Sequence, residues 1–249
     1  MQALILAAGK GTRLHPITNY LPKPMLPLHG KPLLEWAMLP LVAAGVTDFV
    51  LAVSYFAEQI KNYFGDGGRW GVTIHYSEGP APAGKAGEVW RGRQFLLGKG
   101  PFLVIPGDTI CHLDYQKFWD FHRRHGGPVS VAFSTQFHLE VGLAEIDSRQ
   151  RITRFLEKAN LDQPVSTGAY ILEQSIFPHI EKYIGQKQVI DLPGDIFPHL
   201  LAQNISIYGF VGDYYWWDVG RISDYEDLAE LPPAEATRIL QGDFHYKYV

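Results

Sequence analysis

The sequence predicts an α/β protein with three layers, α/β/α, in which helices cover both faces of a mostly parallel sheet. Two observations indicate this class. Short apolar runs, rich in β-branched and aromatic residues, alternate with longer amphipathic runs through the first half of the chain. These short runs lack internal polar alternation, which is typical of strands buried on both faces of a parallel sheet. The chain has 249 residues, enough for one such domain to bury a large core.

In the first half, five apolar runs are expected to form strands and four amphipathic runs between them to form helices. The expected strands are Ala3–Ala8, Phe49–Ser54, Val72–Tyr76, Phe102–Pro106 and Val129–Phe133. The expected helices are Pro32–Ala44, Phe56–Phe64, Ala86–Leu97 and Tyr115–His125. Pro40 lies inside the first helix, where a residue without a backbone N–H should kink or shift it.

The second half is less regular. A hairpin is expected from Leu143–Ile146 and Ile152–Glu157, and further strands from Ala169–Leu172 and Ile205–Phe210. The expected helices are Gln174–Ile184, Gly194–Gln203 and Ile222–Glu230. Because no linker composition separates the halves, we expect one domain over residues 1–230 with a substrate-facing second lobe. A short tail, residues 231–249, is expected to follow.

Charge and composition exclude several classes of protein. The chain has 22 Lys+Arg and 26 Asp+Glu, a net charge of −4, and a pI near 6.2, which argue against a nucleic-acid or membrane partner. One cysteine, Cys111, excludes a disulfide framework and a multi-cysteine zinc site and favours a cytoplasmic location. No apolar run approaches the ~20 residues that cross a bilayer. His122 and His125, spaced as neighbours on one helix face, are expected at the surface.

The amino terminus carries cations without carboxylates. Four cations precede the first acidic residue, Glu35; they are Lys10, Arg13, Lys23 and Lys31. They surround a turn with Gly9 and Gly11 directly after the first expected strand, where backbone N–H groups can approach an anion closely. The Walker A pattern is absent, and Leu14 stands where the dinucleotide fingerprint needs a third glycine. Four prolines follow, so an extended basic loop that suits a polyphosphate is expected.

These residues also carry a family resemblance. Leu-Ala-Ala-Gly-Lys-Gly-Thr-Arg-Leu at 6–14, Leu-Pro-Lys-Pro-Met-Leu-Pro at 21–27 and Lys-Pro-Leu at 31–33 resemble the signature of the sugar-1-phosphate nucleotidyltransferases. The resemblance continues in the family's order at 107–108, 155–158, 166–170 and 217–220, and so spans about residues 2–228. It is strongest toward the mannose-1-phosphate guanylyltransferase branch, partly through Asp191–Pro198. It implies a Rossmann-like, GT-A-like single domain with a sugar-binding lobe and no added β-helix domain.

The resemblance implies an enzyme that converts an NTP and a hexose 1-phosphate into an NDP-sugar and pyrophosphate. It implies catalytic roles for Arg13, Lys23 and Asp108, and a Mg²⁺ cofactor bound by Asp108 and Asp218. The implied nucleotide-binding residues are Ala8, Gly9, Gly11, Thr12, Glu78, Gly84 and Gly87. The implied sugar-phosphate-binding residues are Gly142, Glu157, Lys158 and Thr167. The expected partners are an NTP and a sugar 1-phosphate. The resemblance also implies a possible homo-oligomer, since oligomers are common in the family, but the sequence does not indicate an interface.

Departures from the family pattern leave the substrates open. Gly79 and Lys85 depart in the stretch that recognises the base, and Ser166 and Ala159 depart near the sugar residues. Lys85 either adds a cation near the phosphates or points to solvent. GTP and mannose 1-phosphate are the first expectation. The alternatives are a UDP-, dTDP- or CDP-sugar pyrophosphorylase that uses glucose 1-phosphate, and a non-catalytic relative that senses nucleotide sugars. A dinucleotide oxidoreductase is disfavoured by Leu14.

Overall fold

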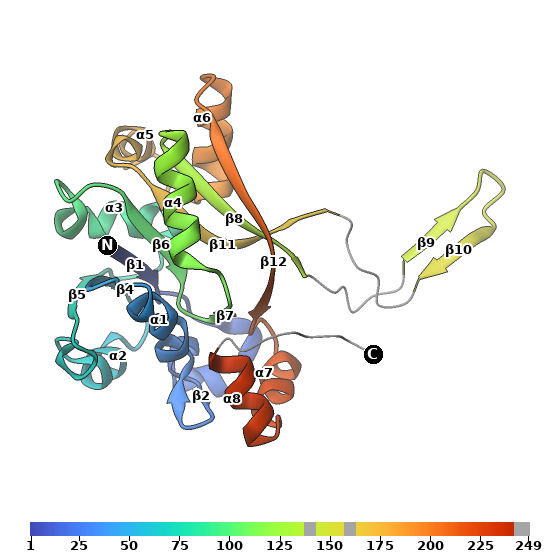
Figure 1. Cartoon of the computed structure of the whole chain (residues 1–249), viewed down its shortest axis with the longest axis horizontal. Coiled ribbons are helices and arrows are strands. Elements are labelled where there is room, and N and C mark those ends of the chain that lie inside the picture. The colour runs from blue at the N-terminus through green and yellow to red at the C-terminus, as the bar shows by residue number, and fades with distance from the viewer. Residues whose placement is uncertain (137–142, 157–162, 242–249) are drawn as a thin grey trace.

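A computed structural model describes residues 1–136, 143–156 and 163–241, and an eight-stranded sheet runs through its middle (Figure 1). Its strands are β1 (Gln2–Leu6), β4 (Asp48–Val53), β5 (Thr73–Glu78), β6 (Phe102–Pro106), β7 (Thr109–Cys111), β8 (Val129–Gln136), β11 (Val165–Leu172) and β12 (Ile207–Asp218). The order across the sheet is β5-β4-β1-β6-β11-β8-β12-β7. Pairing is parallel from β5 to β6 and between β8 and β12, whereas β11 and β7 are antiparallel to their neighbours. The predicted mostly parallel sheet is confirmed.

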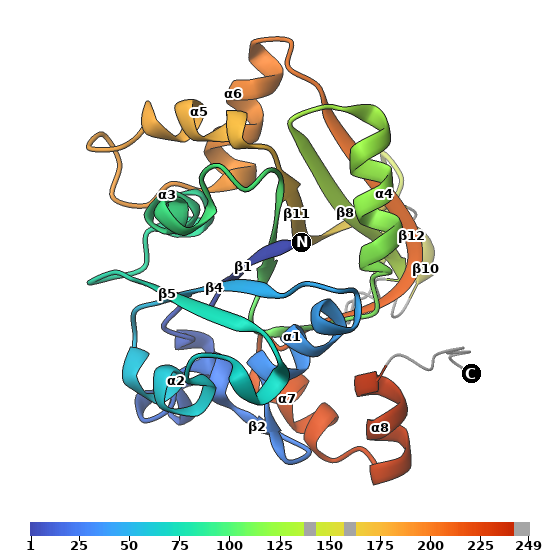
Figure 2. The same ribbon diagram turned by 60° about the vertical axis from the view of Figure 1, so that its left-hand side comes forward.

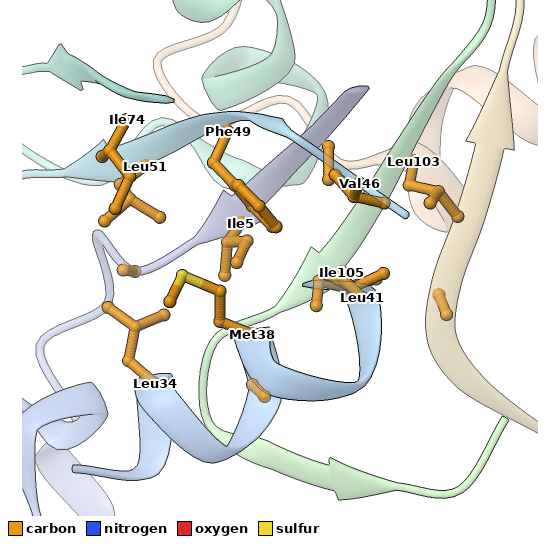
Figure 3. Close-up of a cluster of buried hydrophobic side chains, with 14 of the residues drawn as sticks. Ile5, Leu34, Met38, Leu41, Val46, Phe49, Leu51, Ile74, Leu103 and Ile105 are labelled. Atoms are coloured by element: carbon orange, nitrogen blue, oxygen red, sulfur yellow. The ribbon is translucent and has the colours of Figure 1, made fainter. Parts of the chain in front are cut away.

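Helices cover both faces of this sheet, as predicted (Figure 2). One face packs against α1 (Leu33–Ala43), α2 (Ala57–Phe64) and α4 (Tyr115–His125). The other packs against α3 (Gly84–Leu96), α5 (Phe177–Glu181) and α6 (Phe197–Ala202). Successive strand residues serve opposite faces: Ile5 is buried in the first cluster, shown in Figure 3, and Leu4 in the second.

A third apolar cluster lies under the amino-terminal loop. It joins Leu14 and Leu26 to side chains of α7 (Ile222–Ala229) and α8 (Pro233–Gln241). Helix α8 occupies part of the segment expected as a short tail, and it is anchored because Ile239 and Leu240 are buried in this cluster. The short strands β2 (Pro27–Leu28) and β3 (Lys31–Pro32) pair with each other within the same loop.

The predicted elements of the first half agree with the structure to within three residues, but several other elements differ. Strand β12 continues well past Phe210 to Asp218, and β7 was not predicted. The helix expected at Gln174–Ile184 is a 3₁₀ turn followed by α5, and the one expected at Gly194–Gln203 is a π turn followed by α6. In both cases a proline stands in the first turn of the α-helix, the position that tolerates it. Helix α1 continues through Pro40 and ends within the next turn.

The predicted hairpin is present as a separate two-stranded sheet of β9 (Leu143–Ile146) and β10 (Ile152–Leu156). The carboxylate of Asp147 closes its turn by accepting hydrogen bonds from the N–H groups of Arg149 at 2.9 Å and Arg151 at 3.0 Å. Among the residues that the structure describes, no helix is long and apolar enough to cross a membrane.

The expectation that His122 and His125 lie at the surface is wrong for His122. Its side chain is buried, and its Nδ1 lies 2.8 Å from the hydroxyl of Ser130 on β8. His125 is half-buried and stacks on Tyr208 of β12 with ring centroids 3.9 Å apart. This face of α4 therefore packs against the sheet, and burial lowers the pKa of both histidines.

Candidate active site

A glycine turn follows β1 at the edge of the sheet where the carboxyl ends of β1, β4 and β6 meet. Gly11 has φ +63°, and a Cβ there would lie 2.9 Å from Cβ of Lys23 and 3.0 Å from Cγ2 of Thr18. Only glycine fits this position without strain. The buried Thr18 hydroxyl also donates a hydrogen bond to the Gly11 carbonyl at 2.9 Å. Gly9, in contrast, has open space where a Cβ would stand. The turn is therefore supported from behind and open in front.

A cleft of about 270 Å³ opens against this turn. It brings together six residues singled out from the sequence, which are Gly9, Gly11, Thr12, Arg13, Lys23 and Asp108. Four residues that the sequence analysis did not assign complete the lining; they are Leu6, Leu14, Pro24 and Gly220. Ala8, also expected to contact nucleotide, is buried beside the turn with 4% of its surface exposed.

Strand pairing at the edge of the sheet brings Asp108 and Asp218 together. Asp108 lies in the turn between β6 and β7, and Asp218 pairs with Thr109 across β7 and β12. The turn starts tightly because the Gly107 N–H donates to the Leu6 carbonyl at 2.9 Å. A Cβ on Gly107 would lie 2.9 Å from Cδ1 of Leu34. Close packing of Gly107 therefore holds Asp108 next to the glycine turn.

Lys23 joins the two carboxylates. Its Nζ lies 2.6 Å from Oδ2 of Asp108 and 3.4 Å from Oδ1 of Asp218. The lysine side chain is 8% exposed, whereas the carboxyl side chains are 29% and 39% exposed. Lys23 begins a 3₁₀ turn, Lys23–Met25, that follows Pro22. The ammonium is thus a buried cation between two partly exposed carboxylates, and of these two Asp108 lines the cleft.

Arg13 lies at the same end of the cleft. A Cβ on Gly220 would lie 3.1 Å from Nη1 of Arg13 and 3.4 Å from Oδ2 of Asp218. The guanidinium therefore lies close over Gly220, where a Cβ would be in tight contact with it. Asp224, which the sequence analysis missed, is also close; its Oδ2 accepts a hydrogen bond from the Arg221 N–H at 2.6 Å and fixes the start of α7. Gly220 stood in the motif at 217–220, but no pattern pointed to Asp224.

The donor set of Asp108 and Asp218 fits a hard divalent cation. Both carboxylates already approach one positively charged group, the Lys23 ammonium. Across the described residues, no group of three or more His, Cys, Asp and Glu side chains is arranged to hold a metal. Two carboxylates suit Mg²⁺, which keeps several waters and completes its shell with phosphate oxygens, better than a metal that needs an all-protein cage.

The stretch expected to bind the base is built differently. Gly84 has φ +78°, and a Cβ there would lie 2.4 Å from the carbonyl oxygen of Ile190. The same oxygen accepts hydrogen bonds from Ala86 and Gly87 at 3.0 and 3.1 Å. Glu78 forms an ion pair with Lys61 at 2.5 Å. Gly84, Gly87 and Glu78 are not among the residues that line the cleft at the glycine turn.

Of the expected sugar-phosphate residues, Thr167 is described. It is buried, its hydroxyl donates to the Ala132 carbonyl at 3.2 Å, and the next residue, Gly168, would place a Cβ 2.9 Å from Pro106. Gly142, Glu157 and Lys158 lie outside the described residues. Lys85 does not point simply to solvent, because its Nζ lies 5.9 Å from the ring centroid of Tyr170 on β11.

The chain is similar to known proteins along most of its length. The family model described as nucleotidyl transferase matches residues 2–233. A UTP–glucose-1-phosphate uridylyltransferase of Synechocystis sp. is 35% identical over 242 residues, 90% of this chain and 61% of that protein. The mannose-1-phosphate guanylyltransferase of Mycobacterium tuberculosis is 32% identical over 253 residues, 98% of this chain and 69% of that protein. This chain therefore spans about three-fifths to two-thirds of the length of these relatives.

Solved structures share the fold. HddC from Yersinia pseudotuberculosis, complexed with GMP-PN, is 27% identical with a TM-score of 0.68, covering 92% of this chain and 98% of its own. A Bacillus anthracis structure, 22% identical, covers 100% of this chain and 98% of its own with a TM-score of 0.74, which supports the Rossmann-like fold alone. With the family match over residues 2–233, these findings establish that the chain belongs to the nucleotidyl transferase family, among the sugar-1-phosphate nucleotidyltransferases.

Proposed function

We propose that the protein transfers a nucleotidyl group from an NTP to a hexose 1-phosphate and releases pyrophosphate. The observation that carries this proposal is the ion pairing of Lys23 with Asp108, both of which line the cleft beside the open glycine turn, and with Asp218 next to them. Cations, carboxylates and an exposed backbone turn in one cleft are the groups that a reaction between two phosphates requires.

The proposed reaction is a single displacement. An oxygen of the sugar phosphate attacks the α-phosphorus of the NTP, and the bond from that phosphorus to the oxygen bridging to the β-phosphate breaks. The pyrophosphate leaves with this bond's electrons. Such a reaction depends on alignment of the phosphates and on neutralisation of their charge, with no nucleophilic side chain needed.

The residues of the cleft divide this work. The Arg13 guanidinium lies over Gly220 at the cleft edge, and its planar donors suit non-bridging phosphate oxygens. Lys23 supplies a second cation from the floor of the cleft. Asp108 and Asp218 would hold Mg²⁺, which neutralises phosphate charge when bound. Gly9 leaves the backbone of the turn open to the phosphates.

For the substrates, we propose GTP and mannose 1-phosphate. This is supported by the name of the Mycobacterium tuberculosis relative and of fungal relatives that are 32–34% identical, such as that of Saccharomyces cerevisiae. It is also supported by the HddC structure, which was determined with GMP-PN. UTP and glucose 1-phosphate are the second candidate pair, favoured by the Synechocystis relative at 35% identity.

Pyrophosphate release tests the proposal. The purified protein is assayed with Mg²⁺ over a grid of GTP, UTP, dTTP, CTP and ATP against mannose and glucose 1-phosphates. We expect the highest kcat/KM with GTP and mannose 1-phosphate. Release restricted to UTP or dTTP would overturn the proposed base and keep the reaction. Tight binding of nucleotide sugars without release from any pair would overturn the reaction and favour a sensor.

A further inference from the structure

Lys23 occupies the position between Asp108 and Asp218 that a divalent cation needs. We propose that Lys23 is a built-in competitor for this cation: in the free protein its ammonium must leave the two carboxylates before a divalent metal binds there. Since the metal and the triphosphate are those of the proposed reaction, the inference rests on the proposed function. The inference adds a binding order to the proposed reaction: the metal enters with the triphosphate rather than before the triphosphate.

The first support is the geometry of the lysine. Its Nζ makes both contacts, at 2.6 Å to Asp108 and 3.4 Å to Asp218. Its stem is held against the glycine turn, since a Cβ on Gly11 would stand 2.9 Å from the lysine Cβ. With the side chain 8% exposed, the ammonium has little access to bulk water. It can pair with the carboxylates or reach into the cleft above the turn.

The second support is charge. One ammonium between two carboxylates leaves a net charge of −1, whereas a divalent cation in its place would neutralise them fully. The displaced ammonium would then be a buried charge beside a cation, which is unfavourable. A triphosphate in the cleft removes this penalty, because its oxygens accept hydrogen bonds from Lys23. Metal and triphosphate should therefore raise each other's affinity by the same factor.

Binding of Mn²⁺ to the free protein tests the competition directly. The dissociation constant is measured by electron paramagnetic resonance, without nucleotide or sugar, for the wild type and for Lys23→Met, which keeps the buried stem and removes the charge. We expect at least ~tenfold tighter binding in Lys23→Met. Lys10→Met is the matched control, since it removes one exposed cation from the same turn. Equal affinity in Lys23→Met and wild type, or an equal gain in Lys10→Met, would overturn the proposal.

A second measurement uses the unaltered protein and decides the question if Lys23→Met fails to fold. The rate of reductive methylation at Lys23 is followed by mass spectrometry with and without saturating Mg²⁺. Release of the ammonium from the carboxylates should speed its methylation, with Lys10 unchanged. A methylation rate at Lys23 that does not change with Mg²⁺ would overturn the inference. Neither measurement depends on turnover. A failure of the proposed function would appear in the pyrophosphate assay and would be distinguishable from a failure of this inference.

Discussion

The glycine turn of residues 9–13 and the base stretch of residues 78–88 both contain glycines, and the two regions use them in opposite ways. In the turn, Gly9 faces open space and Gly11 backs onto Lys23, so the backbone is presented to the cleft. In the base stretch, Gly84 is pressed against the carbonyl of Ile190, which belongs to the protein's own chain. A glycine in a motif therefore indicates that something approaches the backbone closely, but it does not tell whether this is a ligand or another part of the protein.

The charged residues in or beside the two regions also differ in whether they face the cleft or the protein interior. Lys23 pairs with the carboxylate of Asp108, which lines the cleft, and with that of Asp218. Glu88 points inward, where its Oε1 accepts hydrogen bonds from the Ala83 N–H at 2.8 Å and from Arg91 at 3.1 Å. A charge pair that lines a cleft can be exchanged for a ligand's charges, whereas the pairing of the buried Glu88 with the half-buried Arg91 fixes a loop in place.

The largest effect is expected at Asp108. Asp108→Asn keeps the shape of the turn and removes half of the negative charge that Lys23 faces. We expect pyrophosphate release to fall by about 10²–10³-fold because charge neutralisation in the cleft is lost, with little change in melting temperature. Asp114→Asn is the control: this residue caps α4 through the Lys117 N–H, and asparagine also caps well. Full turnover in Asp108→Asn would remove Asp108 from the mechanism.

Two glycine substitutions test the comparison between the regions. Gly84→Ala places a methyl against the Ile190 carbonyl at a positive φ, and we expect it to lower the free energy of unfolding by about 2–4 kcal/mol. Gly9→Ala meets open space, so its unfolding free energy should stay within about 0.5 kcal/mol of wild type. Its methyl enters the cleft, and the KM for NTP should rise.

Urea unfolding and steady-state kinetics on both glycine variants measure these effects. The comparison would break if Gly9→Ala lost stability while Gly84→Ala kept it. The comparison would be strengthened if Gly84→Ala, assayed well below its melting temperature, kept the wild-type KM for NTP. That result would mean that Gly84 supports the fold and does not contact the nucleotide.

Glu88 gives a smaller, pH-dependent effect. Burial raises the pKa of its carboxyl in the folded protein above the ordinary value of 4.5. The folded state therefore holds this proton more tightly than the unfolded state does. That contribution to stability is complete below pH 4.5 and is lost as the pH rises through the folded-state pKa. Glu88→Gln cannot ionise, so the unfolding free energy of wild type relative to this variant should fall from low pH toward pH 7.

Urea unfolding over this pH range measures the difference, and Glu88→Ala is the companion variant. It leaves the buried Ala83 N–H without its acceptor and should cost about 1–3 kcal/mol at every pH. Parallel pH curves for wild type and Glu88→Gln would contradict the prediction that burial raises the pKa of Glu88.

Much of the fold followed from local pattern. Tyr115–His125 was predicted with the bounds of α4, because a half-buried helix shows its period in the sequence. The strand predicted at Ile205–Phe210 ends eight residues before β12 does, at Asp218, and the longer strand contains Gly209 and Gly212, residues that weaken a strand. In the structure, a Cβ on Gly209 would stand 3.3 Å from the Phe133 ring, so the glycine serves pairing with β8. Only tertiary pairing explains such a strand.

Helix α8 and the site show what a local sequence pattern can and cannot predict. Helix α8 had a readable signal, since Ala236, Ile239 and Leu240 have helical spacing and are buried together. The order of motifs identified Lys23 and Asp108 as site residues. Their contact could not be predicted, because it depends on how the loop that carries Lys23 packs against the turn between β6 and β7, which no local pattern encodes.

The smallest expected signal comes from Cys111, which lies on β7 opposite Trp216 of β12. Burial raises the pKa of its thiol to about 12, so little of the reactive thiolate exists at pH 8. We expect a disulfide reagent such as DTNB to label the folded protein slowly and the urea-unfolded protein at once. Because the same strand pair places Asp218 beside Asp108, this slow rate measures how firmly the acidic end of the cleft is held. Immediate labelling of the folded protein would contradict this prediction and show that a reagent reaches the thiol on β7 without unfolding of the chain.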